Sequence, residues 1–597
     1  MSDSSSSKLV VQGLKWPLLA LFMSFTLASC ASWQANQDAD RAAPEAATGF
    51  TEQQGATATR YMVAAATEAA TDAGVEMLAK GGTAIDAAIA VQAMLTLTEP
   101  QSSGIGGGAF ILYWDNQAKR LYTIDAREKA PFNATPELFL REDGTPERWI
   151  DAVVGGRSVG VPGVLAGLKL AHDKWGQRPW SEAFQTTIAK AEQGFEVSPR
   201  LAKLVALEIN PGLRKMPVAS DYFFPNGEPL KAGTVKRNPA LAETLRTIAA
   251  EGIDPFYQGE LARSMVAAVQ NSPIAPGLLS MKDLAEYQPQ LREPVCTPYR
   301  EMSVCGMGPP SSGGIAVNQI LGILNQFELA DLPVNSPAAI HLFAQASRLA
   351  FADRNQYVAD SDFVDVPVAE LLAADYLAAR AKLIQPTDMG QAQPGNMPVA
   401  RVASQSLEQP NTSHMAIVDS YGNAISMTTS IEMGFGSTVM VNGYLLNNQL
   451  TDFSLSPTVN GQLVANRVQP GKRPRSSMAP AMVFAPNGDL RHVVGSPGGT
   501  RIINYVAQTI VGLIDWDLSM QAAIDLPRIA NLNGATFIEN LETSEFDPEA
   551  VAAALRERGH EVRVTDLNSG LHGITLGEDG QLHGGADPRR EGRAKGR

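Results

Sequence analysis

The feature that most constrains the fold of this chain is an abrupt change of character at Thr412. Residues 383–411 form a polar run broken by prolines, and TSHMAIVDSYGNAISM follows directly. This second stretch is typical of a strand, a tight turn and another strand. A buried strand that begins without any lead-in, after an accessible segment, is expected if the chain is cut before Thr412.

A threonine at a new chain terminus has a clear chemical use. Its hydroxyl is a poor nucleophile unless a base stands beside it, and a terminal threonine carries its own base in the α-amine. The pKa of a free α-amine is about 8, which is already close to a working pH. The pattern therefore predicts acyl transfer by an N-terminal nucleophile, Thr412.

Acyl transfer also needs donors for the oxyanion and groups that hold the substrate. In VVGSPGGTRIINYV, Gly498 and Gly499 lie between an expected strand and an expected helix, where bare amides can point at one site. Polar residues suited to a charged substrate occur in three short motifs, DAREKAP, LLNNQLTDFS and RPRSSMAP. They are Arg127, Asn448, Gln449, Asp452, Ser476 and Ser477. Each of these signals is weak when taken singly.

Several other kinds of chemistry fail their sequence tests. The glycines of SGIGGGAF precede a strand and lack a following Gly-Lys-Ser/Thr, so they favour a tight turn over a phosphate loop. The seven histidines show no HExxH spacing, and no G-x-S-x-G elbow occurs. We expect no metal and no cofactor. The net charge of −14 argues against nucleic acid as a partner.

The N-terminus predicts export. Lys8 and Lys15 precede the apolar run WPLLALFMSFTLASC, which is short for a membrane span and typical of a signal peptide. Its end resembles a lipoprotein box, with Cys30 as the lipidated residue; the alternative is an ordinary signal cut a few residues later. We expect residues 1–30 to be the signal peptide and 31–58 a flexible stalk. The enzyme would then face the periplasm, anchored by lipid to the outer membrane of a Gram-negative bacterium.

The two remaining cysteines lie in PVCTPYREMSVC, where two strand-like runs flank a polar turn. Cys296 and Cys305 could face each other across a hairpin and form a disulfide in an oxidising compartment. Two buried free thiols are the equal alternative.

The order of expected elements indicates the fold class. Apolar residues recur at helical spacing in YMVAAATEAATDAGVEMLAKGG and in TAIDAAIAVQAMLTL, and residues 160–390 look mainly helical. Short strands separated by glycine turns dominate the last third of the chain. This α/β pattern predicts two sheets between helical layers.

Taken as a set, the motifs resemble one family. TSHMAIVD, GNAISMTTS, LLNNQLTDFS, KRPRSSMAP, GSPGGTRI and GGADPRREG, with SGIGGGAF, DAREKAP, PPSSGGIA and LAFADRNQYVADSDF before them, resemble the gamma-glutamyltransferase (glutathione hydrolase) family of N-terminal nucleophile hydrolases. The resemblance covers roughly residues 60–590. It implies a four-layer αββα sandwich that cleaves itself between Asn411 and Thr412. The products would be a large subunit, 59–411, and a small subunit, 412–597, which stay together as an intertwined heterodimer.

The resemblance also implies roles for individual residues. Thr412 would be the nucleophile, and Gly498 and Gly499 the oxyanion-hole pair. The side chains of Arg127, Ser476 and Ser477 would hold the substrate α-carboxylate, and those of Gln449 and Asp452 its α-ammonium. The substrate would be a gamma-glutamyl compound such as glutathione, and the acyl group would pass to water, an amino acid or a dipeptide.

Three features depart from the family pattern. Ser430 stands where a second threonine is common, and Glu432 stands where well-known members have an asparagine that helps hold the ammonium. The segment between Asp452 and Ser476 is shorter than the usual lid. Two alternatives therefore stay open: an acylase for glutaryl-type beta-lactam side chains, and a binding lipoprotein that never cleaves.

Overall fold

The computed structural model describes residues 49–399, 401–403 and 411–597. The predicted signal peptide, with Cys30, lies outside the described residues. Within the described ranges, no helix is both long enough and apolar enough to cross a membrane.

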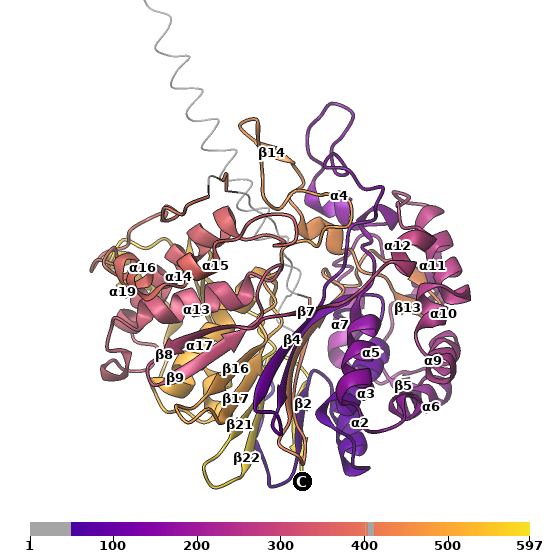
Figure 1. Cartoon of the computed structure of the whole chain (residues 1–597), viewed down its shortest axis with the longest axis horizontal. Helices are drawn as coiled ribbons and strands as arrows, with labels where there is room; N and C mark the ends of the chain where they lie inside the picture. Colours follow the sequence, from indigo (N-terminus) through magenta and orange to yellow (C-terminus); the bar gives the residue numbers. More distant parts are fainter. Residues whose placement is uncertain (1–48, 400, 404–410) are drawn as a thin grey trace, which may run out of the picture. The chain divides into compact units, whose positions relative to one another are not determined.

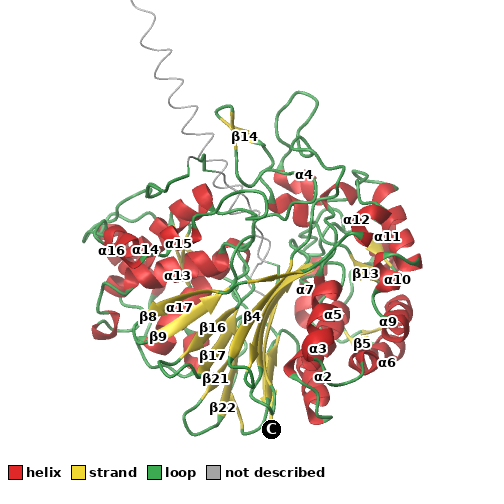
Figure 2. Cartoon of the chain, viewed as in Figure 1, coloured by secondary structure: helices red, strands yellow, loops and turns green. Residues whose placement is uncertain are grey.

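Two antiparallel seven-stranded sheets form the centre of the fold (Figures 1 and 2). The first sheet has the strand order β23 (Arg593–Gly596), β2 (Met62–Ala65), β10 (Ser413–Val418), β11 (Ala424–Ser430), β3 (Gly108–Asp115), β4 (Arg120–Ala126) and β7 (Gln290–Arg292). The second has the order β1 (Ala56–Ala58), β22 (Leu582–Ala586), β21 (His572–Leu576), β17 (Leu490–Gly495), β16 (Ala481–Phe484), β9 (Met302–Gly306) and β8 (Val295–Tyr299).

Helices cover the outer face of each sheet. Against the first sheet lie α2 (Glu68–Ala79), α3 (Ala84–Thr98) and α5 (Val164–Trp175). Against the second lie α13 (Gly313–Leu324) and α17 (Ile502–Ile514), with α14 (Pro337–Tyr357) packed on α13. Strands β10 and β11 face β17 and β21 across the interior. The predicted αββα sandwich is confirmed.

The remaining helices and short strands extend these layers and connect them. The helices are α4 (Trp149–Val153), α6 (Gln185–Gln193), α7 (Pro199–Ala206), α8 (Pro217–Phe223), α9 (Pro239–Glu251), α10 (Asp254–Tyr257), α11 (Glu260–Gln270), α12 (Met281–Ala285), α15 (Val368–Leu371), α16 (Ala374–Ala381), α18 (Met520–Asp525) and α19 (Pro548–Glu557). The strands are β5 (Phe195–Glu196), β6 (Val235–Lys236), β12 (Met440–Val441), β13 (Tyr444–Leu445), β14 (Thr458–Val459), β15 (Gln462–Leu463), β18 (Ile529–Asn531), β19 (Thr536–Glu539) and β20 (Val562–Thr565).

Both sheets take strands from each side of the Asn411–Thr412 bond. In the first sheet, β10 lies between β2 and β11, so the strand that follows the bond pairs with one from near the start of the fold. In the second, β16 pairs with β9. Neither sheet is complete without both parts of the chain.

Helix α3 shows how the sequence builds this core. All of its residues are buried, because it lies against both β10 and β11 as well as α2 and α5. It begins with a capping box, in which Thr83 accepts from the amide of Asp86 and the Asp86 carboxylate accepts from the amide of Thr83. A helix with apolar residues on every face is stable only in an interior.

One prediction about the start of the fold was wrong, and the fold begins a few residues earlier than predicted. The stretch expected to be one helix from residue 61 begins as strand β2, and the helix starts only at Glu68, where the Thr67 hydroxyl accepts from the amide of Ala70. The tertiary pairing of β2 with β10 and β23 overrides the helical preference of alanine. In addition, residues 56–58 of the predicted stalk form β1, which pairs with β22.

Part of residues 383–411, the run predicted to be loose, is fixed by hydrogen bonds to the rest of the fold. The amide of Gly395 donates to Asp353 at 2.8 Å, and that of Ala392 donates to Asn533 at 2.7 Å. Residues 404–410 lie outside the described residues.

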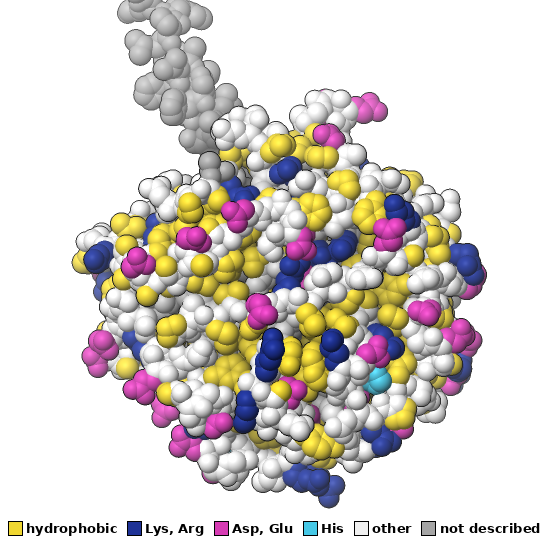
Figure 3. Space-filling model, in the orientation of Figure 1, with side chains coloured by type: hydrophobic (Ala, Val, Ile, Leu, Met, Phe, Trp, Pro, Cys, Tyr) yellow, Lys and Arg dark blue, Asp and Glu magenta, His cyan; other side chains and the backbone are white. Residues whose placement is uncertain are grey.

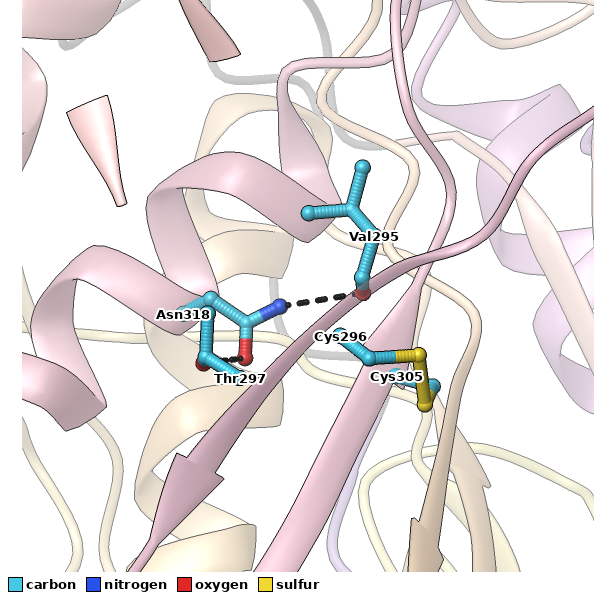
Figure 4. Close-up of a disulfide and its surroundings, with 5 residues drawn as sticks. All are labelled: Val295, Cys296, Thr297, Cys305 and Asn318. Atoms are coloured by element: carbon cyan, nitrogen blue, oxygen red, sulfur yellow. Dashed lines mark hydrogen bonds between the residues drawn. A yellow bond between two sulfur atoms is a disulfide. The ribbon is translucent and has the colours of Figure 1, made fainter. Parts of the chain in front are cut away.

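A disulfide joins Cys296 and Cys305, which face each other in the β8–β9 hairpin (Figure 4). Of the two alternatives open from sequence, the structure therefore has the bridge. Asn318 of α13 supports the hairpin: its amide group donates to the carbonyl of Val295 at 3.3 Å and its oxygen accepts from Thr297 at 2.7 Å.

Charged side chains of both signs are distributed over the face of the protein shown in Figure 3. Acidic and basic side chains lie among hydrophobic and neutral ones on that face.

Candidate active site

The β10–β11 hairpin brings Thr412 and Ser430 together. Its turn is fixed by Asp419, whose carboxylate accepts from the amides of Tyr421 and Asn423 at 2.9 Å each. Strand register then places Ser413 opposite Thr429, so that Thr412 and Ser430 meet at the open end of the pair.

Thr412 and Ser430 form a hydrogen-bonded chain with the peptide bond that precedes Thr412. The Thr412 hydroxyl donates to Ser430 Oγ at 3.2 Å, and the Ser430 hydroxyl donates to the carbonyl of Asn411 at 2.9 Å. The amide of Glu432 also donates to Ser430 Oγ, at 2.8 Å. Thr412 is only 3% exposed and Asn411 is fully buried. The nucleophile predicted from sequence thus lies beside the carbonyl it would attack.

The backbone on the other side of Thr412 is held by charged residues. Arg590 donates to the Thr412 carbonyl at 3.0 Å, and the Ser413 hydroxyl donates to Glu99. Burial raises the pKa of Glu99, while Arg200 and Arg590 oppose that rise. Arg590 was not among the site residues predicted from sequence, although its motif, GGADPRREG, was part of the resemblance.

One small pocket collects most of the predicted site residues. It is lined by Thr412, Ser430, Glu432, Gln449, Asp452, Ser476, Ser477, Met478, Gly499 and Ile502. Eight of these ten were named from sequence. Three other residues named from sequence, Arg127, Asn448 and Gly498, do not line the pocket.

The carboxylates and amides in the pocket contact one another. Asn448 donates to Glu432 at 2.6 Å, and Gln449 donates to Asp452 at 2.9 Å. Glu432 has a φ of +77°, a left-handed conformation that is uncommon for a residue with a side chain. Residues held in such conformations cluster at functional sites.

Arg127 reaches the site through Asp452. Its guanidinium is fully buried and pairs with the Asp452 carboxylate, and it also donates to the carbonyl of Pro474 at 3.3 Å. The structure therefore shows Arg127 holding Asp452, and its predicted contact with a substrate carboxylate stays a prediction.

Behind Arg127 lies a buried acid that sequence reasoning missed. Glu128 is 3.5 Å from the Arg127 guanidinium. Burial raises the pKa of Glu128 to about 8, although the charge of Arg127 opposes the rise. Glu128 directly follows Arg127 in DAREKAP. Its position next to a predicted site residue was the only sequence signal that could have pointed to it.

Gly498 and Gly499 form the turn between β17 and α17. Gly498 has a φ of +135° and Gly499 a φ of +56°, and a Cβ at Gly498 would lie 2.6 Å from the ring of Tyr505. Only glycine fits this turn without strain. The turn places Gly499 at the pocket, next to the beginning of α17.

Ser476 and Ser477 enter the pocket from the loop before β16. The carbonyl of Ser476 accepts from both the amide and the hydroxyl of Ser312, at 2.7 Å each. Ser477 Oγ accepts from Arg354 at 2.7 Å. Within the part of the chain that the structure describes, no three His, Cys, Asp or Glu side chains converge to hold a metal.

The fold and this site together define a class of protein. Two antiparallel sheets between helices, with a buried threonine at the start of a central strand and its hydroxyl beside the preceding carbonyl, are the arrangement of N-terminal nucleophile hydrolases. The model of one family, described as gamma-glutamyltranspeptidase, matches residues 70–597. The chain belongs to this family.

Individual relatives agree with that assignment. The glutathione hydrolase proenzyme of Bacillus subtilis strain 168 is 38% identical over 552 residues, covering 90% of this chain and 91% of the relative. The acylase ACY 1 proenzyme of Pseudomonas sp. strain SE83 is 36% identical, covering 92% and 96%. Among solved structures, the cephalosporin acylase from Bacillus halodurans matches with a TM-score of 0.81 and 29% identity, covering 93% of this chain and 99% of that one.

Proposed function

We propose that the protein is a gamma-glutamyltransferase and glutathione hydrolase that first cuts its own chain before Thr412. The observation that carries the proposal is the hydrogen-bonded chain from Thr412 through Ser430 to the Asn411 carbonyl, at a pocket that also holds two carboxylates. Family membership and relatives named glutathione hydrolase support it.

Self-cleavage follows from the geometry around Ser430. Thr412 Oγ1 attacks the carbonyl carbon of Asn411, and the developing negative charge on the oxygen is stabilised by the Ser430 hydroxyl. The C–N bond breaks, the hydroxyl proton passes to the departing nitrogen, and an ester remains on Thr412. Water hydrolyses this ester, leaving a carboxylate on Asn411 and a free amine and hydroxyl on Thr412.

The mature enzyme then uses the same hydroxyl on a substrate. The Thr412 α-amine takes the hydroxyl proton while Oγ1 attacks the side-chain carbonyl of a gamma-glutamyl amide. The amides of Gly498 and Gly499 stabilise the oxyanion. The leaving amine takes the proton, and a gamma-glutamyl ester remains. Water or the amino group of an amino acid or dipeptide then takes the acyl group and restores Thr412.

Charge in the pocket favours a gamma-glutamyl group over a glutaryl group. Glu432 and Asp452 both line the pocket, and carboxylates attract the α-ammonium that glutamyl has and glutaryl lacks. Ser476 and Ser477 supply hydroxyls for the α-carboxylate. The likeness to a cephalosporin acylase keeps glutaryl transfer as the second candidate.

A denaturing gel with N-terminal sequencing tests the first step. The purified chain should give a band of about one-third of its length that begins Thr-Ser-His-Met. Thr412→Ala should be folded, uncut and inactive because it lacks the attacking hydroxyl, whereas Thr429→Ala, at a buried threonine in the same hairpin, should be cut. Normal processing of Thr412→Ala would exclude Thr412 as the nucleophile. An intact wild-type band would support the alternative of a catalytically inactive binding protein that never cleaves.

Substrate comparison tests the second step. The cut enzyme should release p-nitroaniline from gamma-glutamyl-p-nitroanilide much faster than from glutaryl-p-nitroanilide. The opposite order would identify an acylase.

We further propose that the protein is exported and anchored by lipid at Cys30 to the outer membrane, facing the periplasm. The basic and apolar N-terminal sequence that ends in LASC supports this. A disulfide between Cys296 and Cys305 suits an oxidising compartment. Labelled palmitate should be incorporated into the wild type and not into Cys30→Ser, and fractionation of cells should place the wild type in the outer membrane.

A further inference from the structure

The end of helix α14 reaches the pocket through one buried arginine. Arg354 lies in the last turn of α14 and is only 2% exposed. Its guanidinium donates to Ser477 Oγ at 2.7 Å and to Ser312 Oγ at 2.8 Å. It belongs to the motif LAFADRNQYVADSDF, to which the predicted mechanism gave no role.

The direction of these hydrogen bonds is fixed by chemistry. A guanidinium has N–H donors and no acceptor, so Ser477 Oγ must accept from Arg354. The hydroxyl hydrogen of Ser477 is then directed away from Arg354, and Ser477 lines the pocket. A positive charge behind a hydroxyl also strengthens that hydroxyl as a donor, because hydrogen bonds in a chain polarise one another.

Ser312 extends the same support to the neighbouring pocket residue. It accepts from Arg354, and its hydroxyl and amide both donate to the carbonyl of Ser476. Ser476 in turn donates its amide to the carbonyl of Pro310 at 3.1 Å. Two residues that precede the proposed cut, Ser312 and Arg354, thus fix two pocket serines that follow it.

We infer that Arg354 is a positioning residue that aims the Ser477 hydroxyl at the α-carboxylate of the substrate, with Ser312 as its partner at Ser476. The inference rests on the proposed function, because it assigns a support to the carboxylate end of the gamma-glutamyl pocket. It makes recognition of that carboxylate depend on both fragments of the cut chain.

The test compares two substrates that differ only in the carboxylate: gamma-glutamyl-p-nitroanilide and 4-aminobutyryl-p-nitroanilide. Arg354→Gln should raise KM for the first by about tenfold or more, the effect of losing a charge-assisted hydrogen bond, with kcat changed less. The ratio of kcat/KM between the two substrates should fall by the same factor. Arg354→Lys should restore part of it.

Arg348→Gln is the matched control. Arg348 is equally buried on the same helix, but it pairs with Asp388 at 3.0 Å instead of reaching the pocket. This variant should leave the substrate ratio unchanged. If Arg354→Gln lowers kcat/KM for both substrates by one factor, Arg354 is merely structural and the inference is wrong.

Two further variants keep the test informative if Arg354→Gln is not processed. Ser312→Ala should also lower the ratio of kcat/KM for gamma-glutamyl-p-nitroanilide to that for 4-aminobutyryl-p-nitroanilide, by a smaller factor than Arg354→Gln does. An unchanged ratio in Ser312→Ala would contradict the inference. In a Ser477→Ala background, Arg354→Lys should change this kcat/KM ratio by a smaller factor than it does in the wild type, because only the contact through Ser312 remains; an equal factor in both backgrounds would contradict the inference. If the wild type cuts neither anilide, the proposed function itself fails; if it cuts gamma-glutamyl anilide and the variants keep the ratio, only the inference fails.

Discussion

Ser430 lies between the attacking hydroxyl and the carbonyl under attack. Ser430→Ala removes the donor to the Asn411 oxygen, so self-cleavage should slow by about a hundredfold or more. Ser430→Thr keeps a hydroxyl and should be processed. The fraction of cut chain on denaturing gels over time gives the rates.

Ser426→Ala is the control for this prediction, because Ser426 lies on the same strand but donates to the carbonyl of Val494. Processing of Ser430→Ala at the wild-type rate would mean that the carbonyl is polarised by another group.

Glu128 gives a prediction about pH. Its pKa is raised to about 8 in the folded protein by burial and is about 4.5 in the unfolded chain. The stability it contributes is fully present below pH 4.5 and is lost as the pH rises through about 8. Glu128→Gln mimics the neutral acid and does not titrate. The free energy of unfolding of this variant minus that of the wild type should therefore rise by roughly 1 kcal/mol per pH unit between pH 5 and 8.

Urea unfolding at pH 5.5, 6.5, 7.5 and 8.5 measures this difference. Glu293→Gln, at a side chain that is 89% exposed, should show no such trend. A constant difference between Glu128→Gln and wild type over this range would show that Glu128 is ionised when folded.

At the scale of elements, the β8–β9 hairpin joins a disulfide to the pocket. It forms the edge of the second sheet, and its strand β9 leads into the turn at Pro310 and Ser312 that holds Ser476. The bridge closes a loop with a sequence separation of 9. Replacing both cysteines by serine should lower the free energy of unfolding by about 2–3 kcal/mol, because the unfolded chain regains that loop entropy.

Urea unfolding of wild type and the double variant, each with and without a phosphine reductant, measures the loss. Reductant should destabilise the wild type and leave the double variant unchanged. Equal stability of all four samples would show that the bridge adds nothing to the hairpin.

The sequence was sufficient for elements whose pattern is local. Helix α3 was predicted from its apolar run, and the β10–β11 hairpin from its turn residues. Strands β1 and β2 were missed because they are short and their pairing partners, β22 and β23, come from the far end of the chain. No local pattern carries that information.

The residues of the candidate active site also fall into those that the sequence predicted and those that it did not. Thr412 followed from its strand-start position and chemistry, and most other pocket residues came from matching motifs. Glu128 and Arg590 were missed, because their effect depends on burial beside Arg127 and on contact with the Thr412 carbonyl. Contacts of this kind appear only when the layers are assembled.

At the scale of the whole molecule, cutting before Thr412 separates the chain without separating the fold. Strand β10 has β2 on one side and β11 on the other, and β11 then pairs with β3. The two fragments should therefore elute as one species in size-exclusion chromatography without denaturant, and as two in concentrated guanidinium. Elution of the small fragment alone in native buffer would contradict the interleaved sheets.

The burial of the Asn411–Thr412 bond sets the kinetics of maturation. Asn411 is fully buried and Thr412 is 3% exposed, so the active site of another copy has no access to this bond. We therefore expect the proposed maturation to be a first-order event in each molecule, with a half-time independent of enzyme concentration. A cell that carries one normal and one Thr412-defective gene would accumulate the defective product as unprocessed precursor, however much mature enzyme it also contains.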